Sequence, residues 1–274
     1  MKIQQLIQQS SRPLVMGILN VTPDSFSDGG HFHLLDSALK HCQQMLDLGV
    51  DIIDIGGEST RPGADYVPLE QEMQRVLPVL ERIKQEFDTY VSIDTYKPQL
   101  MAEAINLGAD MINDVRALAE PEALSVVAAS EVDVCLMHMR GNPRTMQQNT
   151  QYSNVVDEVN DFLQQRIQAC VDMGINPQRI CIDPGFGFGK SVEQNYQMLA
   201  QFEQFHQLGY PVLAGLSRKS MLGAVTAKEP AERIDASVAA ATIAAIKGAN
   251  IIRVHDVAQT IDAMAVVAAT LKEQ

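Results

Sequence analysis

Eight short apolar stretches rich in Val, Ile and Leu recur along this 274-residue chain, and each is followed by a polar or glycine-rich segment. Their apolar residues are continuous rather than alternating, which is typical of strands that are covered on both faces. The chain is therefore expected to fold around a buried parallel β-sheet. The eight stretches span residues 14–19, 50–55, 91–94, 111–113, 132–137, 180–183, 212–216 and 251–254.

Helical patterns lie between these stretches. Apolar residues recur at helical spacing over residues 35–48 and over 154–171, and Asp36 is placed to cap the first of these helices. At five places a glycine stands between a helical pattern and the next apolar stretch, which predicts a repeated joint with the glycine as helix C-cap. The five glycines are Gly49, Gly108, Gly174, Gly209 and Gly248.

Strands and helices that alternate in this way predict an α/β fold, a closed TIM (β/α)₈ barrel. The length agrees with this fold, because such a barrel takes about 250 residues. The alternative is a doubly wound open sheet, but no GxGxxG pattern follows the first stretch and the composition does not change at mid-chain. No linker or low-complexity segment interrupts residues 1–274, so a single domain is expected.

The overall charge of the chain is strongly acidic. Its formal net charge is −13 at pH 7, and its isoelectric point is about 4.8. A general nucleic-acid-binding protein needs a basic face, so no nucleic-acid partner is expected. An anionic small substrate is not excluded, because a local cluster of Arg and Lys can dominate one cleft.

No segment of the sequence indicates a membrane or secreted protein. The N-terminal segment lacks the apolar region of a signal peptide, and the longest apolar stretch, residues 238–246, is too short to span a bilayer. A cytoplasmic protein without a membrane partner is expected. The cysteines form no CxxC pair and are expected to be buried free thiols: Cys42, Cys135, Cys170 and Cys181.

Unusual polar residues gather at the carboxyl ends of the apolar stretches. Asn20 follows the first stretch, Asp94 closes the third and Asp183 closes the sixth. In a TIM barrel these ends converge on one face, which is where active sites lie. A single Asp after a strand is often only a helix N-cap, but its recurrence at nearly every strand predicts a functional site at this face.

Four of these polar residues have the chemistry to bind a flat heterocycle. A carboxylate can pair bidentately with an amidine edge, while an amide and an ammonium serve the acceptors of the ring. The alternative for each residue is a structural ion pair. The four residues are Asp94, Asn113, Asp183 and Lys219.

Two residues near the last stretch indicate an anion site. Arg253 and His255 stand two positions apart on the eighth strand, and barrels usually bind phosphate in the loops after strands seven and eight. Asn20, on the neighbouring first strand, offers a neutral oxygen that suits Mg²⁺. The alternative for His255 is a satisfied core or surface histidine. A zinc site is not expected, because the sequence offers no three-ligand set at metal spacing.

Seven ordered motifs across nearly the whole chain resemble those of the dihydropteroate synthase family. They are MGILNVTPDSFSDGG (16–30), DIGGESTRPG (54–63), SIDTYKP (92–98), INDV (112–115), DPGFGFGK (183–190), GLSRKS (215–220) and RVHDV (253–257). The resemblance implies that the chain condenses 6-hydroxymethyl-7,8-dihydropterin diphosphate with p-aminobenzoate. This reaction would give 7,8-dihydropteroate and diphosphate in folate biosynthesis, and sulfonamides would compete with p-aminobenzoate.

The resemblance also implies a role for each matching residue. For the pterin diphosphate these are Thr60, Asp94, Asn113, Val115, Met137, Asp183, Lys219, Arg253 and His255, with Val115 and Met137 packing on the ring faces. For p-aminobenzoate they are Phe26, Thr60, Arg61, Pro62, Phe188, Lys219 and Ser220. Asn20 would hold Mg²⁺ with the diphosphate, and catalysis would fall to Asp28, Lys219, Arg253 and His255. A homodimer is expected, with the small-residue segment 236–245 as a candidate interface. The alternative for this segment is tight packing of a helix on the barrel.

In the implied reaction the p-aminobenzoate amine displaces diphosphate, so no protein nucleophile is needed. Asp28 would stabilise the cation at the methylene carbon. The two long loops that follow the first two strands, residues 20–33 and 56–68, can cover the barrel mouth and exclude water. One alternative is a pterin-binding methyltransferase, which would not require the SRKS and STRPG segments. Another is a catalytically silent paralogue, which would be expected to lose Arg253, Lys219 or Phe26.

Overall fold

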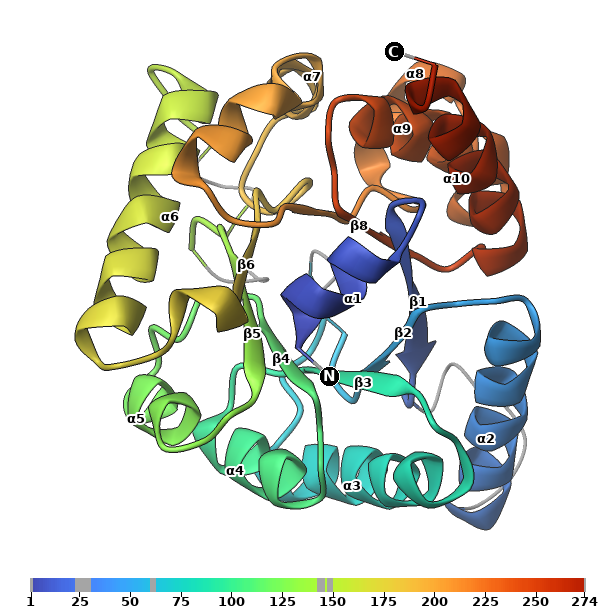
Figure 1. The fold of residues 1–274 in the computed structure, drawn as a ribbon, viewed down its shortest axis with the longest axis vertical. Coiled ribbons are helices and arrows are strands. Elements are labelled where there is room, and N and C mark those ends of the chain that lie inside the picture. Colours follow the sequence, from blue (N-terminus) through green and yellow to red (C-terminus); the bar gives the residue numbers. More distant parts are fainter. Residues whose placement is uncertain (1, 23–30, 60–62, 142–145, 147–149, 274) are drawn as a thin grey trace.

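The computed structural model describes residues 2–22, 31–59, 63–141, 146 and 150–273. In this described part the chain forms an eight-stranded parallel barrel surrounded by helices (Figure 1), as the alternating pattern predicted. Each predicted strand is confirmed, with its ends displaced by no more than two residues. The strands are β1 (Leu14–Asn20), β2 (Ile52–Gly56), β3 (Tyr90–Asp94), β4 (Met111–Asp114), β5 (Asp133–Met137), β6 (Ile180–Asp183), β7 (Leu213–Ala214) and β8 (Ile251–Val254).

The strand order shows how the barrel closes. The sheet runs β6-β5-β4-β3-β2-β1-β8-β7. Its two outer strands meet through a parallel bridge between Ile182 and Val212, and the Ile182 amide donates to the carbonyl of Pro211 at 2.9 Å. This closure makes the alternative of a doubly wound open sheet wrong. It also places the carboxyl ends of all eight strands at one rim.

Helices follow the strands and form the outer layer of the barrel (Figure 1). The five predicted glycines each follow a helix and adopt φ between +78° and +100°, so their C-cap role is confirmed. The helices are α1 (Ile3–Gln9), α2 (His31–Asp47), α3 (Leu69–Glu86), α4 (Pro98–Asn106), α5 (Ala123–Ala128), α6 (Val155–Asp172), α7 (Val192–Ala200), α8 (Ser220–Thr226), α9 (Ile234–Ile246) and α10 (Val257–Leu271). The short 3₁₀ segments are η3 (Pro177–Arg179), η4 (Phe202–Leu208) and η5 (Pro230–Glu232).

Asp36 is not the cap of α2, and that prediction is wrong. The helix begins at His31, so Asp36 lies within it and is exposed. No glycine or proline separates position 31 from Asp36, so nothing in the sequence stops the helix from starting directly after Gly30. Asn154 does cap α6, because its side chain accepts from the amides of Val156 and Asp157.

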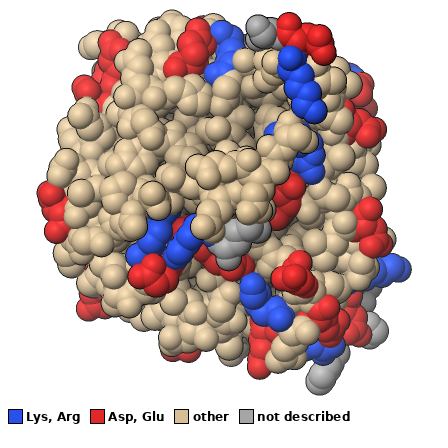
Figure 2. All heavy atoms as spheres, viewed as in Figure 1, with Lys and Arg blue, Asp and Glu red and all other residues tan. Residues whose placement is uncertain are grey.

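The amino end of the barrel is closed by α1, which lies across it in Figure 1. The Asp133 carboxylate accepts at 2.6 Å from the Ile3 amide and at 2.6 Å from the Tyr90 hydroxyl, which ties this helix to β3 and β5. Figure 2 shows uncharged residues over the upper middle of this face, with charged side chains around its edge and just below its middle. The buried side chains beneath are Ile3, Leu14, Met16, Ile52, Tyr90, Met111, Cys135, Cys181, Leu213 and Ile251.

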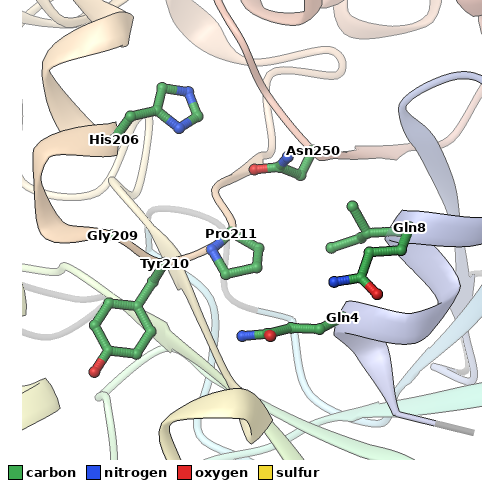
Figure 3. Close-up of a pocket in the computed structure, with 8 residues that line it drawn as sticks. Gln4, Gln8, His206, Gly209, Tyr210, Pro211 and Asn250 are labelled. Atoms are coloured by element: carbon green, nitrogen blue, oxygen red, sulfur yellow. The ribbon is translucent and has the colours of Figure 1, made fainter.

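A cavity of about 320 Å³ opens at this same amino end, beside α1. Gln4 and Gln8 project from α1 towards Tyr210 and Pro211, which precede β7 (Figure 3). Asn250 precedes β8 and completes this wall. The cavity therefore lies at the opposite end of the barrel from the predicted site residues.

The four cysteines are buried and free, as predicted. Among the described helices, none combines the length and the apolarity that a membrane span requires.

The loop after β6 depends on glycine at position 185. Gly185 has φ +71°, and a Cβ built there would overlap the carbonyl oxygen of His138. We expect Gly185→Ala to lower the free energy of unfolding by about 3 kcal/mol, because left-handed strain and overpacking combine. Gly174→Ala is the matched control, since Gly174 has φ +89° but nothing within 4 Å of its Cβ position; it should cost only about 1 kcal/mol. Urea unfolding measures both values, and equal losses would contradict the overlap.

Candidate functional site

A half-buried arginine links three strands at the carboxyl end of the barrel. Arg253 on β8 donates through Nε to Asp54 Oδ2 on β2 and through Nη2 to Asp94 Oδ2 on β3, each at 2.6 Å. The Asp54 side chain is 0% exposed, and those of Asp94 and Arg253 are 8% and 20% exposed. The structural ion pair considered for Asp94 is therefore present.

Asp54 is the functional candidate that sequence reasoning missed. Its Oδ2 also lies 3.4 Å from Asn113 Nδ2 on β4, so one carboxylate contacts two of the predicted site residues. Its Oδ1 is buried, with no hydrogen-bond partner among the described residues. The available signal was an acidic residue inside the apolar stretch 50–55, where a strand covered on both faces should carry none.

The predicted carboxylate and ammonium on β6 and after β7 lie at the same rim. Asp183 Oδ1 accepts from the Gly185 amide at 2.7 Å. Lys219 Nζ donates to the carbonyl of Phe186 at 2.7 Å and lies 4.0 Å from the ring centroid of Phe188. The charge of Lys219 lowers the pKa of Asp183, and the charge of Asp183 raises the pKa of Lys219.

Burial changes the protonation of these groups. It raises the pKa of Asp94 to about 7, against the opposing effect of Arg253 and with a further rise from Asp54. Burial likewise raises the pKa of Asp183, and it lowers the pKa of Lys219 to about 8 although Asp183 acts in the opposite direction. For Arg253, burial lowers the pKa, but Asp54 and Asp94 outweigh it and the pKa rises. We call these residues, together with Asp54 and Asn113, the cup. It holds groups that can exchange protons near neutral pH.

An apolar wall stands beside these polar groups. Val115, Met137 and Phe188, which were predicted to contact the two substrates, pack together with Met146 in one buried cluster. Val115 directly follows β4 and Met137 ends β5, so the wall rises from the same rim as the carboxylates. An apolar surface with a few convergent polar groups is the usual form of a small-molecule site.

The end of β1 offers an amide oxygen to the same rim. A Cβ added at Gly56 would lie 3.6 Å from Asn20 Oδ1 and 3.9 Å from Asp94 Oδ2, so both oxygens lie close to this glycine. A neutral amide oxygen suits Mg²⁺, which takes few protein ligands when phosphate oxygens are present. Among the described residues, no three His, Cys, Asp or Glu side chains form a metal-binding group.

His255 lies one residue beyond the end of β8, not on the strand as the sequence suggested. Its Nδ1 is 3.0 Å from Ser217 Oγ, in the loop after β7. Ser220 is exposed at the first position of α8. The remaining predicted site residues lie outside the described residues: Phe26, Asp28, Thr60, Arg61 and Pro62.

Comparisons with known proteins identify relatives of this architecture. A family profile described as "Pterin binding enzyme" matches residues 16–255. The chain is 55% identical over 260 residues to the dihydropteroate synthase of Haemophilus influenzae, which covers 95% of this chain and 94% of that protein.

Two solved structures match closely. Yersinia pestis dihydropteroate synthase with a sulfonamide drug complex has a TM-score of 0.91 at 51% identity, over 96% of this chain and 95% of that one. Xanthomonas albilineans dihydropteroate synthase with 4-aminobenzoic acid has a TM-score of 0.90 at 50% identity, over 95% and 93% of the two chains.

The raised pKa of Asp94 gives a testable pH dependence. Its folded-state pKa of about 7 exceeds the ordinary value of 3.8, so the folded protein binds this proton more tightly and Asp94 lowers stability as the pH rises between those values. Asp54→Asn should lower the pKa of Asp94, because it removes a neighbouring negative charge. Carboxyl ¹³C NMR titration measures the midpoint, with the exposed Asp235→Asn as control. A wild-type midpoint below pH 5 would contradict the assignment.

Proposed function

Because the chain belongs to the dihydropteroate synthase family of pterin-binding enzymes, we propose that the rim around Arg253 is its catalytic centre. The family reaction joins a dihydropterin diphosphate to p-aminobenzoate with release of diphosphate. The observation that carries the proposal is the meeting of three carboxyl groups, an amide and two cations beside an apolar wall. These polar groups belong to Asp54, Asp94, Asn113, Asp183, Lys219 and Arg253.

The pterin ring would lie between the apolar wall and the polar floor. Asp183 would accept from the amidine edge of the ring. Among the described residues, the hydrogen bond that its side chain accepts comes from the Gly185 amide to Oδ1. Asn113 and Lys219 would serve the ring's acceptors. Val115 and Met137 would pack on its faces.

Arg253 would act between the pterin and its diphosphate. Its bonds to Asp54 and Asp94 hold the guanidinium at the floor of the cup, which fixes it before the substrate arrives. A preorganised cation stabilises a leaving anion without reorganisation at the moment of reaction. Arg253 therefore keeps its predicted role towards diphosphate, while its ion pairs hold it in the pterin cup.

Diphosphate and metal would be held at the end of β1 and β8. Asn20 Oδ1 would bind Mg²⁺ together with diphosphate oxygens, and His255 and Thr60 would bind the diphosphate. When bound, Mg²⁺ supplies positive charge that neutralises the leaving diphosphate. Asp28 would stabilise the cation at the methylene carbon; its role and that of Thr60 rest on the resemblance alone.

The second substrate would enter beside the wall. Phe188 lies under the Lys219 ammonium, and Ser220 begins α8 next to it, so these residues can flank p-aminobenzoate. The sequence motifs add Phe26, Thr60, Arg61 and Pro62 to this pocket. The ligands of the two structural relatives, 4-aminobenzoic acid and a sulfonamide drug, support this substrate and a competing sulfonamide.

A homodimer through the last helices stays part of the proposal. Large apolar side chains are exposed on α9 and α10, where Ile243, Ile246 and Val266 are 44%, 52% and 66% exposed. These helices lie side by side in Figure 1 and contact one another. An exposed apolar surface of this kind suits a second copy of the chain. The single domain over residues 1–274 and the cytoplasmic location stay predictions.

The decisive test of function is product formation from p-aminobenzoate and the dihydropterin diphosphate. We expect 7,8-dihydropteroate and diphosphate by mass spectrometry, and loss of turnover when EDTA removes Mg²⁺. Arg253→Ala should reduce kcat/KM by about 100-fold, because a preorganised charge is lost. Arg82→Ala is the control, since Arg82 forms a surface ion pair with Glu86 on α3. Normal turnover in Arg253→Ala would overturn the proposed site.

The homodimer has its own test. Ile246→Glu combined with Val266→Glu should yield monomers in analytical ultracentrifugation, because two charges would enter an apolar contact. Met173→Glu is the matched control, since Met173 is 49% exposed but lies after α6. A wild-type protein that sediments as a monomer at micromolar concentration would contradict the dimer.

A further inference from the structure

Two loops at the rim are joined by two successive side-chain contacts. Ser217 Oγ, after β7, lies 3.0 Å from His255 Nδ1, after β8. At the next position of each loop, Arg218 Nε donates to Asp256 Oδ2 at 3.0 Å, and Arg218 Nη2 donates to the other oxygen of the same carboxylate. Both contacts join residues that are 38 positions apart, so the two loops run in register.

The contact between the Ser217 hydroxyl and Nδ1 of His255 bears on which ring nitrogen carries the proton. Ser217 Oγ accepts from the backbone amide of His255 at 3.2 Å, which uses an oxygen lone pair. The hydroxyl proton can then be donated to Nδ1 of His255, which lies 3.0 Å away. A neutral imidazole that accepts at Nδ1 carries its proton on Nε2. Ser217 is 7% exposed, so water competes little for this hydrogen bond.

Arg218 is held in a backbone conformation that keeps Ser217 in place. Its φ is +58°, a left-handed value that a residue with a long side chain seldom adopts. Its amide donates to Ser237 Oγ at 2.9 Å, and its carbonyl accepts from Arg233 Nη1 at 3.0 Å. The bidentate pair with Asp256 adds the side chain to these restraints. Strain that is held by so many contacts is typical of functional sites.

We propose that Ser217 is a positioning residue that fixes the ring orientation and the Nε2–H tautomer of His255. We propose further that the Arg218–Asp256 pair keeps Ser217 in reach. This inference rests on the proposed role of His255 in binding diphosphate. In the reaction, the oriented Nε2–H donates to an oxygen of the leaving diphosphate.

The first experiment compares Ser217→Ala with Ser217→Thr, which keeps the hydroxyl. Ring ¹⁵N NMR should show the Nε2–H tautomer of His255 in the wild type and in Ser217→Thr, and a mixture of tautomers in Ser217→Ala. The affinity for inorganic diphosphate with Mg²⁺, measured by calorimetry, should fall about tenfold in Ser217→Ala, as is common when an orienting partner is removed. The KM for p-aminobenzoate should not change.

These outcomes separate the inference from the proposed function. His255→Ala is measured alongside: if it leaves diphosphate affinity unchanged, the proposed role of His255 fails, whatever Ser217 does. If His255→Ala loses affinity but Ser217→Ala keeps both the tautomer and the affinity, the positioning role is overturned. A loss of affinity that Ser217→Thr does not restore would also overturn it, because the hydroxyl would then not be the cause.

A second variant tests the support from Arg218. Arg218→Gly tolerates φ +58° but removes the pair with Asp256, so it separates the ion pair from the backbone strain. We expect a mixture of His255 tautomers and a diphosphate affinity that is about fivefold lower. This loss is smaller than the one expected for Ser217→Ala, which removes the direct partner of the ring. Asp256→Asn should give the same direction. Unchanged spectra and affinity in both variants would overturn the supporting role of the pair.

Discussion

The guanidinium of Arg253 is the group around which the rim is organised. It crosses from β8 to β2 and β3, past β1, and holds two carboxylates that would otherwise lie buried without compensation. Removing one partner of a buried ion pair typically costs about 3–5 kcal/mol, although the intact pair adds little net stability over an apolar contact. The arrangement is thus costly to disturb rather than strongly stabilising. The curvature of the barrel makes it geometrically available. β8, β1, β2 and β3 are neighbours in the sheet, and the curve of the sheet turns their ends towards one another.

The net charge of the resulting cup is close to zero, and a single proton changes it. Three carboxyl groups face two cations, the guanidinium of Arg253 and the ammonium of Lys219. With the pKa of Asp94 at about 7, one proton removes the excess negative charge. A neutral pterin ring with both donors and acceptors can enter such a cup without bringing an unpaired charge. The anionic diphosphate end of the substrate would lie at the neighbouring strands, next to Asn20 and His255.

Much of the fold could be predicted because its signals are local. Continuous apolarity marked every strand, and the glycines marked the joints, since each needs only its own backbone conformation. The start of α2 could not be fixed in this way, because Asp36 is compatible both with a cap and with a helix interior. The site was predicted in its outline from strand-end polarity and in its roles from the resemblance. Asp54 was missed because its importance lies in a contact with a residue 199 positions away.

The same reasoning explains why Ser217 and Arg218 could not be assigned from the sequence. Within GLSRKS they look like polar residues that flank a lysine, and each has a hydroxyl or charge that any surface loop can carry. Their roles depend on the pairing of β7 with β8, because the parallel register of the two strands places residue 217 next to 255 and residue 218 next to 256. A strand of only two residues suffices for this, provided that the loop beyond it is restrained. The precision of the site therefore depends on the loop contacts as much as on the barrel that carries them.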